Sequence, residues 1–329
     1  MPAIQASRLD SLADYAEVEI DLPRPAPGEL RIKVGAVGIG YVDALVALGR
    51  YQVKPPLPHI PGVNVGGTVD AIGADCGGWQ IGDRVMAMVT RGFAEYAIAR
   101  AALTVKLPDE ISVEQGAVVP LNYLTALHAL RDRAGLRAGE TLLVFGAAGG
   151  VGLAAIQIGR TLGAHVIAAA SSPEKRAFAL AHGADSAIDT VAEGWRDRLR
   201  RVLHGKPLGV IVDPVCGPLF EAAFRSLGWG GRHLVVGFVG GAIPALSVNL
   251  SLMKGAVLVG VDERQFVQFE PDRAAAHLKQ IGNWLTRGTI VPPVGRCFSW
   301  VEHQAALSFA LGGAGPGKPV FRVSSAMSA

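Results

Sequence analysis

One short stretch, residues 141–162, constrains the fold of this chain more than any other. The run Thr141-Leu-Leu-Val-Phe145 predicts a buried strand, and the glycine-rich run Gly146-Ala-Ala-Gly-Gly-Val-Gly152 follows it directly. From Val151 onward, apolar residues recur at helical spacing and predict a helix over 151–162. A strand that turns sharply into a helix presents free N–H groups and partial positive charge at the helix start, which is an arrangement that binds phosphate.

The spacing of small residues in this turn sharpens the prediction. Positions 147, 149 and 152 form an Ala-x-Gly-x-x-Gly variant of the dinucleotide fingerprint, in which the backbone must approach a pyrophosphate closely. A second predicted strand, residues 165–170, ends about 18 residues later, as the fingerprint requires. The alternative is an ordinary tight turn in a chain with 42 glycines. The context favours dinucleotide binding, with phosphate contacts from Ala148, Gly149, Gly150 and Val151.

The end of the second strand predicts which dinucleotide is bound. An NAD site usually has an acidic residue there to hold the ribose hydroxyls. This chain has Ala170-Ser171-Ser172-Pro173-Glu174-Lys175-Arg176, with hydroxyls and cations suited to the 2′-phosphate of NADP. The alternative is that Ser172 only caps a helix and the two cations are only exposed. We predict NADPH as the cofactor, recognised by Ser171, Ser172 and Lys175.

The order of predicted strands and helices along the chain predicts an α/β protein with two domains. Residues 124–262 alternate strands and helices, which predicts a Rossmann doubly wound parallel sheet. Within it we expect a helix over 218–227 and strands over 209–213, 232–238 and 256–261. Residues 1–123 form short strands and turns, and after a helix over 271–287 the chain returns to strand-like sequence. We therefore assign 1–123 and 263–329 to a mainly β domain and 124–262 to the Rossmann domain.

Composition excludes several other classes of protein. The formal charge of +3 on 329 residues gives no reason to expect binding to nucleic acid or an anionic membrane. The basic run Arg196–Arg201 is typical of the exposed face of a helix. Three dispersed cysteines predict neither a disulfide framework nor a cysteine-based zinc site, and they fit a reducing cytoplasm. The acidic N-terminal segment does not resemble a signal peptide, and no run has the character of a membrane span.

Several motifs together resemble one family. The chain is similar to the zinc-independent quinone oxidoreductase (zeta-crystallin-like) branch of the medium-chain dehydrogenase/reductase superfamily. The resemblance covers nearly the whole chain and rests on six runs: Val144–Asp189, Pro61–Val69, Gly82–Val85, Val212–Gly217, Gly230–Arg232 and Gly317–Val320. It implies a GroES-like catalytic domain beside the Rossmann domain, and usually a homodimer or homotetramer.

The resemblance also has consequences for metal and substrate. Zinc-dependent relatives have a cysteine in an early Gly-Ile-x-x-x-Asp segment and a later Gly-His-Glu motif, whereas this chain has Gly40 and Gly62-Val63-Asn64 there. Zinc needs three or four ligands, so we predict no metal site. Members of the branch often have Asn at the place of Gly40 and Tyr at the place of Thr190. These departures remove one expected substrate contact and one expected contact near the 2′-phosphate.

Chemistry without a metal requires an acceptor that is already electrophilic, such as a quinone or an α,β-unsaturated carbonyl. The protein must then align the cofactor with the acceptor and exclude water. Tyr41 and Tyr51 flank the segment that corresponds to the family's active site, and either hydroxyl is a candidate donor to the acceptor oxygen, although both are also plausible as structural tyrosines. We read Asp43, in the same segment, as structural, holding a turn or a lysine.

On the cofactor side, the resemblance implies contacts from Thr125, from the backbone of Gly237, Phe238 and Val239, and from Lys318 to a phosphate. We therefore predict an NADPH-dependent reductase of a quinone or an α,β-unsaturated carbonyl. The alternatives are an enoyl-thioester (enoyl-CoA) reductase of the same fold and a non-catalytic NADPH- or RNA-binding crystallin-like protein.

Overall fold

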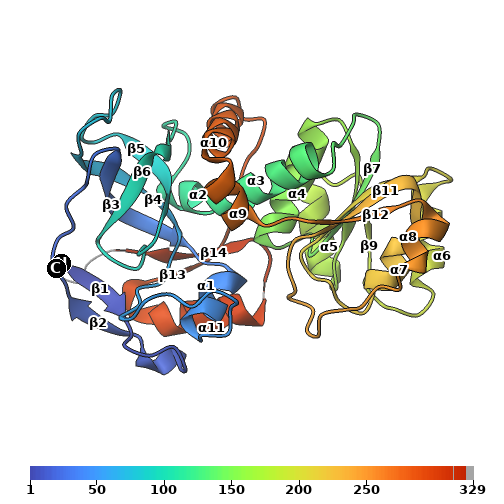
Figure 1. Cartoon of the computed structure of the whole chain (residues 1–329), viewed down its shortest axis with the longest axis horizontal. Helices are drawn as coiled ribbons and strands as arrows, with labels where there is room; N and C mark the ends of the chain where they lie inside the picture. Colours follow the sequence, from blue (N-terminus) through green and yellow to red (C-terminus); the bar gives the residue numbers. More distant parts are fainter. Residues whose placement is uncertain (314, 324–329) are drawn as a thin grey trace. The chain divides into compact units, whose positions relative to one another are not determined.

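The computed structural model describes residues 1–313 and 315–323 (Figure 1). The chain forms two compact units, residues 1–121 with 271–329 and residues 122–270. The second boundary lies after helix α9 (Glu263–Phe269), whereas the sequence placed it at 263. The reason is that Phe266 of α9 stacks on His128, with ring centroids 3.9 Å apart, which ties the helix to the second unit.

The first unit is mainly β. Its larger sheet has the order β13-β14-β3-β4-β5-β6, and β3 also pairs with β6, which closes those strands on themselves. The C-terminal strand β14 pairs with β3 from the N-terminal part of the chain (Figure 1). The strands are β3 (Glu29–Gly38), β4 (Asn64–Ile72), β5 (Arg84–Val89), β6 (Tyr96–Lys106), β13 (Val294–Phe298) and β14 (Lys318–Arg322), with β1 (Pro2–Gln5) and β2 (Ala16–Glu19) forming a separate antiparallel pair.

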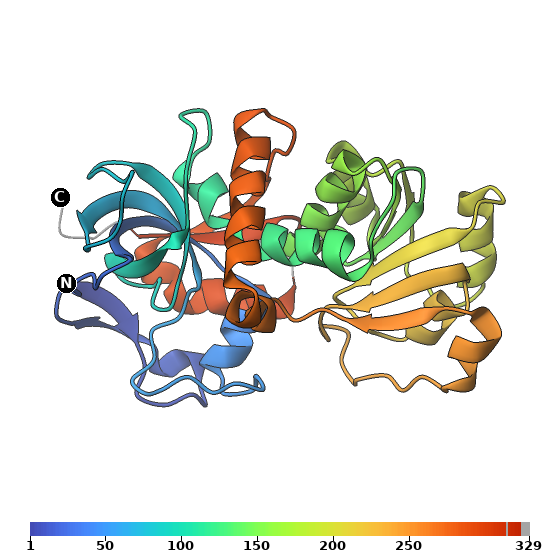
Figure 2. The ribbon, with the colours of Figure 1, turned by 45° about the horizontal axis from the view of Figure 1, so that its top comes forward.

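Helices cover the first unit's sheet and its ends. The long α10 (Pro271–Thr286), orange-red in Figure 2, packs against β6: a Cβ at Gly282 would lie 2.6 Å from Cγ1 of Val105. The other helices are α1 (Tyr41–Ala47), α2 (Val113–Ala117), α11 (His303–Gly312) and the 3-10 turns η1 (Leu12–Asp14) and η3 (Trp300–Glu302). The C-terminal strands β13 and β14 join this unit's sheet, where the sequence analysis placed the tail.

The second unit contains a six-stranded sheet in the order β12-β11-β10-β7-β8-β9, with every pair parallel. This order confirms the predicted doubly wound parallel sheet. Strands β10 to β12 lie side by side in Figure 2. The strands are β7 (Thr141–Phe145), β8 (His165–Ala169), β9 (Ser186–Ile188), β10 (Leu208–Asp213), β11 (Leu227–Val235) and β12 (Val257–Gly260).

Helices pack on both faces of this sheet. Alternate strand residues such as Leu143 and Ile167 face the core under α6 to α8, while Leu142 and Val166 face Gly159 of α4. The helices are α4 (Gly150–Thr161), α5 (Pro173–Ala181), α6 (Trp195–Leu203), α7 (Phe220–Phe224), α8 (Asn249–Lys254) and α9, with α3 (Pro120–Leu127) and the π-helical turn η2 (His128–Arg133) leading into the unit.

Two sequence predictions in this unit were wrong. The helix expected over 218–227 is shortened to α7, because Leu227 already pairs with Leu208 as the first residue of β11. The strand expected over 232–238 ends at Val235. Its partner there is Asp213, the last residue of β10, and Gly237 to Val239 lie in the loop that follows.

Candidate active site

The glycine turn joins β7 to α4 as the sequence predicts. Gly146 has a left-handed φ of +58°, and the N–H of Gly149 donates to its carbonyl at 2.8 Å. A Cβ at Gly152 would clash with that same carbonyl oxygen, so the first helical turn packs this closely only with glycine there. Of the three fingerprint positions, Gly152 therefore has a clear steric requirement for glycine.

The start of α4 is built to receive an anion. Within the described part of the chain, the N–H groups of Gly150, Val151 and Gly152 donate to no protein acceptor, as expected for the first turn of a helix. Gly149 is exposed and Gly150 and Val151 are partly exposed, whereas Ala148 is buried beneath the turn. Free amides, the positive end of a twelve-residue helix and an open backbone fit a diphosphate. Of the four residues predicted to contact the phosphates, Ala148 differs from the others because its side chain is buried in the protein.

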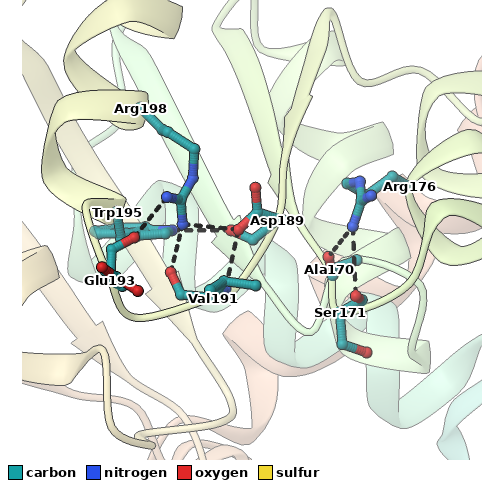
Figure 3. Close-up of polar contacts among 8 residues, drawn as sticks. All are labelled: Ala170, Ser171, Arg176, Asp189, Val191, Glu193, Trp195 and Arg198. Atoms are coloured by element: carbon teal, nitrogen blue, oxygen red, sulfur yellow. Dashed lines mark hydrogen bonds and ion pairs between the residues drawn. The ribbon is translucent and has the colours of Figure 1, made fainter.

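The residues after β8 form the second part of this site (Figure 3). Ser172 caps α5: its hydroxyl oxygen accepts the N–H of Lys175 at 3.3 Å. Arg176 donates from Nη1 to the carbonyls of Ala170, at 3.0 Å, and Ser171, at 3.4 Å. The sequence analysis left open that Ser172 only caps a helix, and the structure shows that Ser172 does cap α5. Ser171 is exposed and Lys175 is partly exposed, so both are accessible to a ligand.

The loop after β9 borders the same end of the sheet (Figure 3). Asp189 accepts the N–H of Val191 at 2.9 Å and pairs with Arg198 Nη2 at 2.9 Å. The indole of Trp195 donates to the Asp189 carbonyl at 2.9 Å. The pKa of Asp189 is lowered: burial opposes the shift, while the Val191 N–H, Arg198 and the charge of Arg176 favour it. Arg198 therefore fixes the loop that contains Thr190, whereas the sequence pattern identifies it only as part of an exposed basic face.

The segment that the resemblance assigns to the nicotinamide lies on α3. Asn122 packs against Gly150, where a Cβ would clash with its side-chain amide. The hydroxyl of Tyr123 donates to Gln157 Oε1 at 2.8 Å inside the protein, and Thr125 is also buried. In the loop after β11, Phe238 and Val239 expose 43% and 45% of their surface, and the Val239 N–H points to the Pro214 carbonyl at 3.4 Å. The loop is thus open, while Thr125 is not.

The predicted catalytic tyrosines belong to the first unit. Tyr41 is the first residue of α1 and is half-buried, and Tyr51 is half-buried in the following loop. Asp43 Oδ2 accepts the N–H of Gly40 at 2.7 Å, and Lys318 is its nearby cation. The structural reading of Asp43 is confirmed. Lys318, predicted to reach a cofactor phosphate, is 4% exposed, and its Cε lies 3.2 Å from the position that a Cβ at Gly38 would occupy.

Sequence reasoning missed two residues of these sites. Arg176 was counted among the cations suited to the 2′-phosphate but was left out of the predicted contact residues, because only the fold places its guanidinium at the end of β8. Asn64 was noticed only as a residue in place of a glutamate. Its Oδ1 accepts the N–H of Leu121 at 2.8 Å, and no local pattern links positions 57 residues apart.

Comparisons with known proteins place the chain in a family. The model for the alcohol dehydrogenase GroES-like domain matches residues 26–109, and the model named zinc-binding dehydrogenase matches residues 150–277. Quinone oxidoreductase-like protein 2 of Bos taurus is 34% identical over 88% of this chain and 84% of its own. Human quinone oxidoreductase is 34% identical over 81% and 82%. The quinone oxidoreductase of Thermus thermophilus, whose structure was also solved in complex with NADPH, superposes with a TM-score of 0.85 at 31% identity, covering 98% and 100%.

A doubly wound parallel sheet and a GroES-like unit define the medium-chain dehydrogenase/reductase superfamily, a class of oxidoreductases. Within it, the identity to these relatives shows that the chain belongs to the quinone oxidoreductase branch. Over residues 1–313 and 315–323, no group of three or more His, Cys, Asp or Glu side chains is placed to hold a metal ion. No helix among those residues is long and apolar enough to cross a membrane.

Proposed function

We propose that this protein is an NADPH-dependent reductase that transfers hydride to a quinone or an α,β-unsaturated carbonyl without a metal. The observation that carries the proposal is the site at the ends of β7 and β8. There, unpaired helix amides lie at one strand end, while the hydroxyls of Ser171 and Ser172 and the cations Lys175 and Arg176 lie at the next. Relatives of the branch, including one solved with NADPH, support the same reading.

The residues that would hold NADPH follow from this geometry. Gly149, Gly150 and Val151 would donate N–H groups to the diphosphate, which the α4 dipole also favours. Ser171, Ser172, Lys175 and Arg176 would hold the 2′-phosphate. The open loop of Gly237, Phe238 and Val239 would take the carboxamide end. When bound, NADPH supplies the hydride.

Fewer residues are proposed to contact the substrate than the cofactor. Tyr41 and Tyr51 are the proposed donors to the acceptor oxygen, where charge develops as hydride arrives at carbon. A quinone or enone spreads this charge by conjugation, so it does not depend on a Lewis acid. The positions that bind catalytic zinc in relatives are Gly40 and Val63 here, and neither side chain is a metal ligand.

The chain's oligomeric state is part of the proposal. Strand β12 is the last strand of its sheet, and its outer edge has no partner strand among the described residues. Apolar side chains around that edge are exposed, including Trp229 at 90% and Leu252 at 84%. An identical strand from a second copy would satisfy the edge by antiparallel pairing about a two-fold axis. We propose a homodimer through β12 and α8.

The experiment that tests the function is turnover of a panel of quinones, simple enones and enoyl thioesters with saturating NADPH. We expect oxidation of NADPH with at least one quinone or simple enone, with kcat/KM above that for crotonyl thioester. A preference for the thioester would favour the enoyl-thioester reductase instead. No turnover with any acceptor would contradict the proposal.

A further inference from the structure

Two buried nitrogen donors of the first unit have no hydrogen-bond acceptor. Lys318, at the start of β14, is 4% exposed, and its Nζ has no partner in the described structure. Asn64, at the start of β4, is fully buried; its Oδ1 is used by Leu121, but its Nδ2 has no partner there. Leaving a buried ammonium without a hydrogen-bonded counter-ion is costly, so such a group is seldom retained without a role.

The strand register brings these two side chains to one face of the sheet. Val320 of β14 lies opposite Gly38 of β3, and Lys318, two residues earlier, points to the same side as Val320. On the other side of β3, Val37 lies opposite Val65, so Asn64 flanks Gly38 on that same face. A Cβ at Gly38 would lie 3.2 Å from Cε of Lys318. The absence of a side chain at Gly38 therefore leaves the space through which the lysine passes.

The carboxylate of Asp43 is the counter-charge to the Lys318 ammonium. It is 6% exposed, and it accepts backbone N–H groups of Gly40, at 2.7 Å, and of Val63. Burial raises the pKa of Asp43, and the charge of Lys318 opposes that shift. Burial lowers the pKa of Lys318 to about 8, and Asp43 opposes it. The charge of each group thus favours the ionised form of the other.

Other charged groups around β14 are engaged elsewhere. Glu114 of α2 pairs with Arg322, at the far end of β14, at 3.0 Å. Arg296 of β13 stacks over the ring of Phe298, with its guanidinium carbon 4.7 Å from the centroid. His303, which begins α11, lies with its ring nitrogens 2.9 and 3.1 Å from the carbonyls of Tyr15 and Trp300. Asp43 is therefore the acid that acts on the Lys318 ammonium.

We propose that Lys318 is a positioning residue for the reduction: its ammonium keeps Asp43 ionised, and Asp43 in turn holds the Gly40–Asp43 turn from which Tyr41 projects. Asn64 is the second part of this device. Its amide carries no charge and so gives the lysine no second counter-ion. With Asn64 the ammonium depends on Asp43 alone, and loss of its proton above neutrality removes the cation from the turn. The role in catalysis rests on the proposed function, whereas the link from Lys318 to Gly40 does not.

Two conservative variants and two readouts test this proposal. Asn64→Asp preserves size and the acceptor for Leu121 but adds a carboxylate beside Lys318; Lys318→Arg keeps a cation that does not lose its proton. The first readout is NMR, with the Lys318 side chain assigned as the Cε signal absent from Lys318→Arg, together with the backbone amide of Gly40. The second is kcat/KM for the best acceptor from pH 6 to 10.

We expect the Lys318 signal and the Gly40 amide to titrate together in the unmodified protein. In Asn64→Asp both midpoints should move alkaline by about one pH unit or more, because a nearby opposite charge favours the ammonium. The alkaline fall in kcat/KM should move with them in Asn64→Asp and vanish in Lys318→Arg, with the change mainly in KM.

The proposal is overturned if the Gly40 amide does not follow Lys318, or if Asn64→Asp moves neither midpoint. It is also overturned if both NMR midpoints shift while the alkaline limb of kcat/KM stays in place. The Gly40 amide is read without substrate. An enzyme that reduces no acceptor but shows linked titrations therefore contradicts the proposed function separately from the ionic link.

Discussion

Arg176 donates from its guanidinium to the backbone carbonyl of Ala170, the residue that directly follows β8, at 3.0 Å. This contact holds a cation at the place where an NAD-preferring site would have an acid. Asp189, in the residues that directly follow β9, is paired with Arg198 at 2.9 Å. The site therefore combines a fixed cation with a carboxylate already occupied by another arginine.

The first prediction concerns cofactor choice. Lys175→Ala and Arg176→Ala should each weaken NADPH binding by about tenfold or more, since a charge-assisted hydrogen bond contributes roughly 1.5–3 kcal/mol. Neither should change NADH binding more than about threefold. Fluorescence titration of both cofactors measures this. Arg160→Ala, an exposed cation on α4, is the control. Equal affinity of the unmodified protein for NADPH and NADH would contradict the preference.

The second prediction concerns the glycine turn. Gly152→Ala should destabilise the second unit by about 1–3 kcal/mol, because the added Cβ clashes with the Gly146 carbonyl and this outweighs the helix propensity of alanine. NADPH affinity should fall with it. Urea unfolding and cofactor titration measure both effects. Gly312→Ala, also in a helix but with no atom within 4 Å of the added Cβ, should be neutral or stabilising. A Gly152→Ala protein as stable as its parent would exclude this account of the turn.

The sequence predicted the Rossmann half of this site well, because its information is local. A strand, a glycine turn and a capped helix such as the one begun by Ser172 are each specified within a few residues. The end of β11 was less predictable: Phe238 belongs to an apolar run, yet the strand ends at Val235, opposite Asp213, where its partner strand β10 also ends. The burial of Lys318 depends on β14 pairing with β3 across more than 270 residues of chain, and no local pattern contains that information. The sequence analysis did not predict helix α1. Asp43, three residues after Gly40, is a signal of a helix start that could have indicated it.

The third prediction concerns stability and pH. Burial raises the pKa of Glu263 at the start of α9 to about 7, and one of its carboxylate oxygens has no partner in the described chain. Between the unfolded pKa of 4.5 and about 7, the folded state binds more protons, so this group's contribution to stability falls as pH rises through that window. Glu263→Gln should therefore raise the unfolding free energy by roughly 1–2 kcal/mol at pH 8.

At pH 4.5 the same substitution should have little effect, because the glutamate is then largely protonated in the folded state. Urea denaturation at the two pH values measures the difference, with Glu110→Gln, an exposed site, as the control. A gain of equal size at both pH values would show that the charge is not its cause.

The fourth prediction concerns assembly. Leu252→Glu places a charge on the exposed face of α8 beside the β12 edge and should convert the proposed dimer to a monomer. Sedimentation velocity at micromolar concentration measures the mass. Val301→Glu, at a residue that is 75% exposed in the first unit, should leave the assembly unchanged. A dimer that survives Leu252→Glu, or an unmodified protein that is monomeric, would contradict the proposed interface.

The central claim, metal-independent hydride transfer from NADPH, is tested most directly by isotope tracing in the cofactor. NADPH deuterated at C4 on one face or the other is oxidised with the best acceptor in the presence of a strong chelator, and the NADP⁺ is analysed by mass spectrometry. We predict that deuterium is lost completely from one stereoisomer and retained in the other, at a rate that the chelator does not change. Deuterium retained in NADP⁺ from both stereoisomers, or turnover abolished by the chelator, would contradict the account.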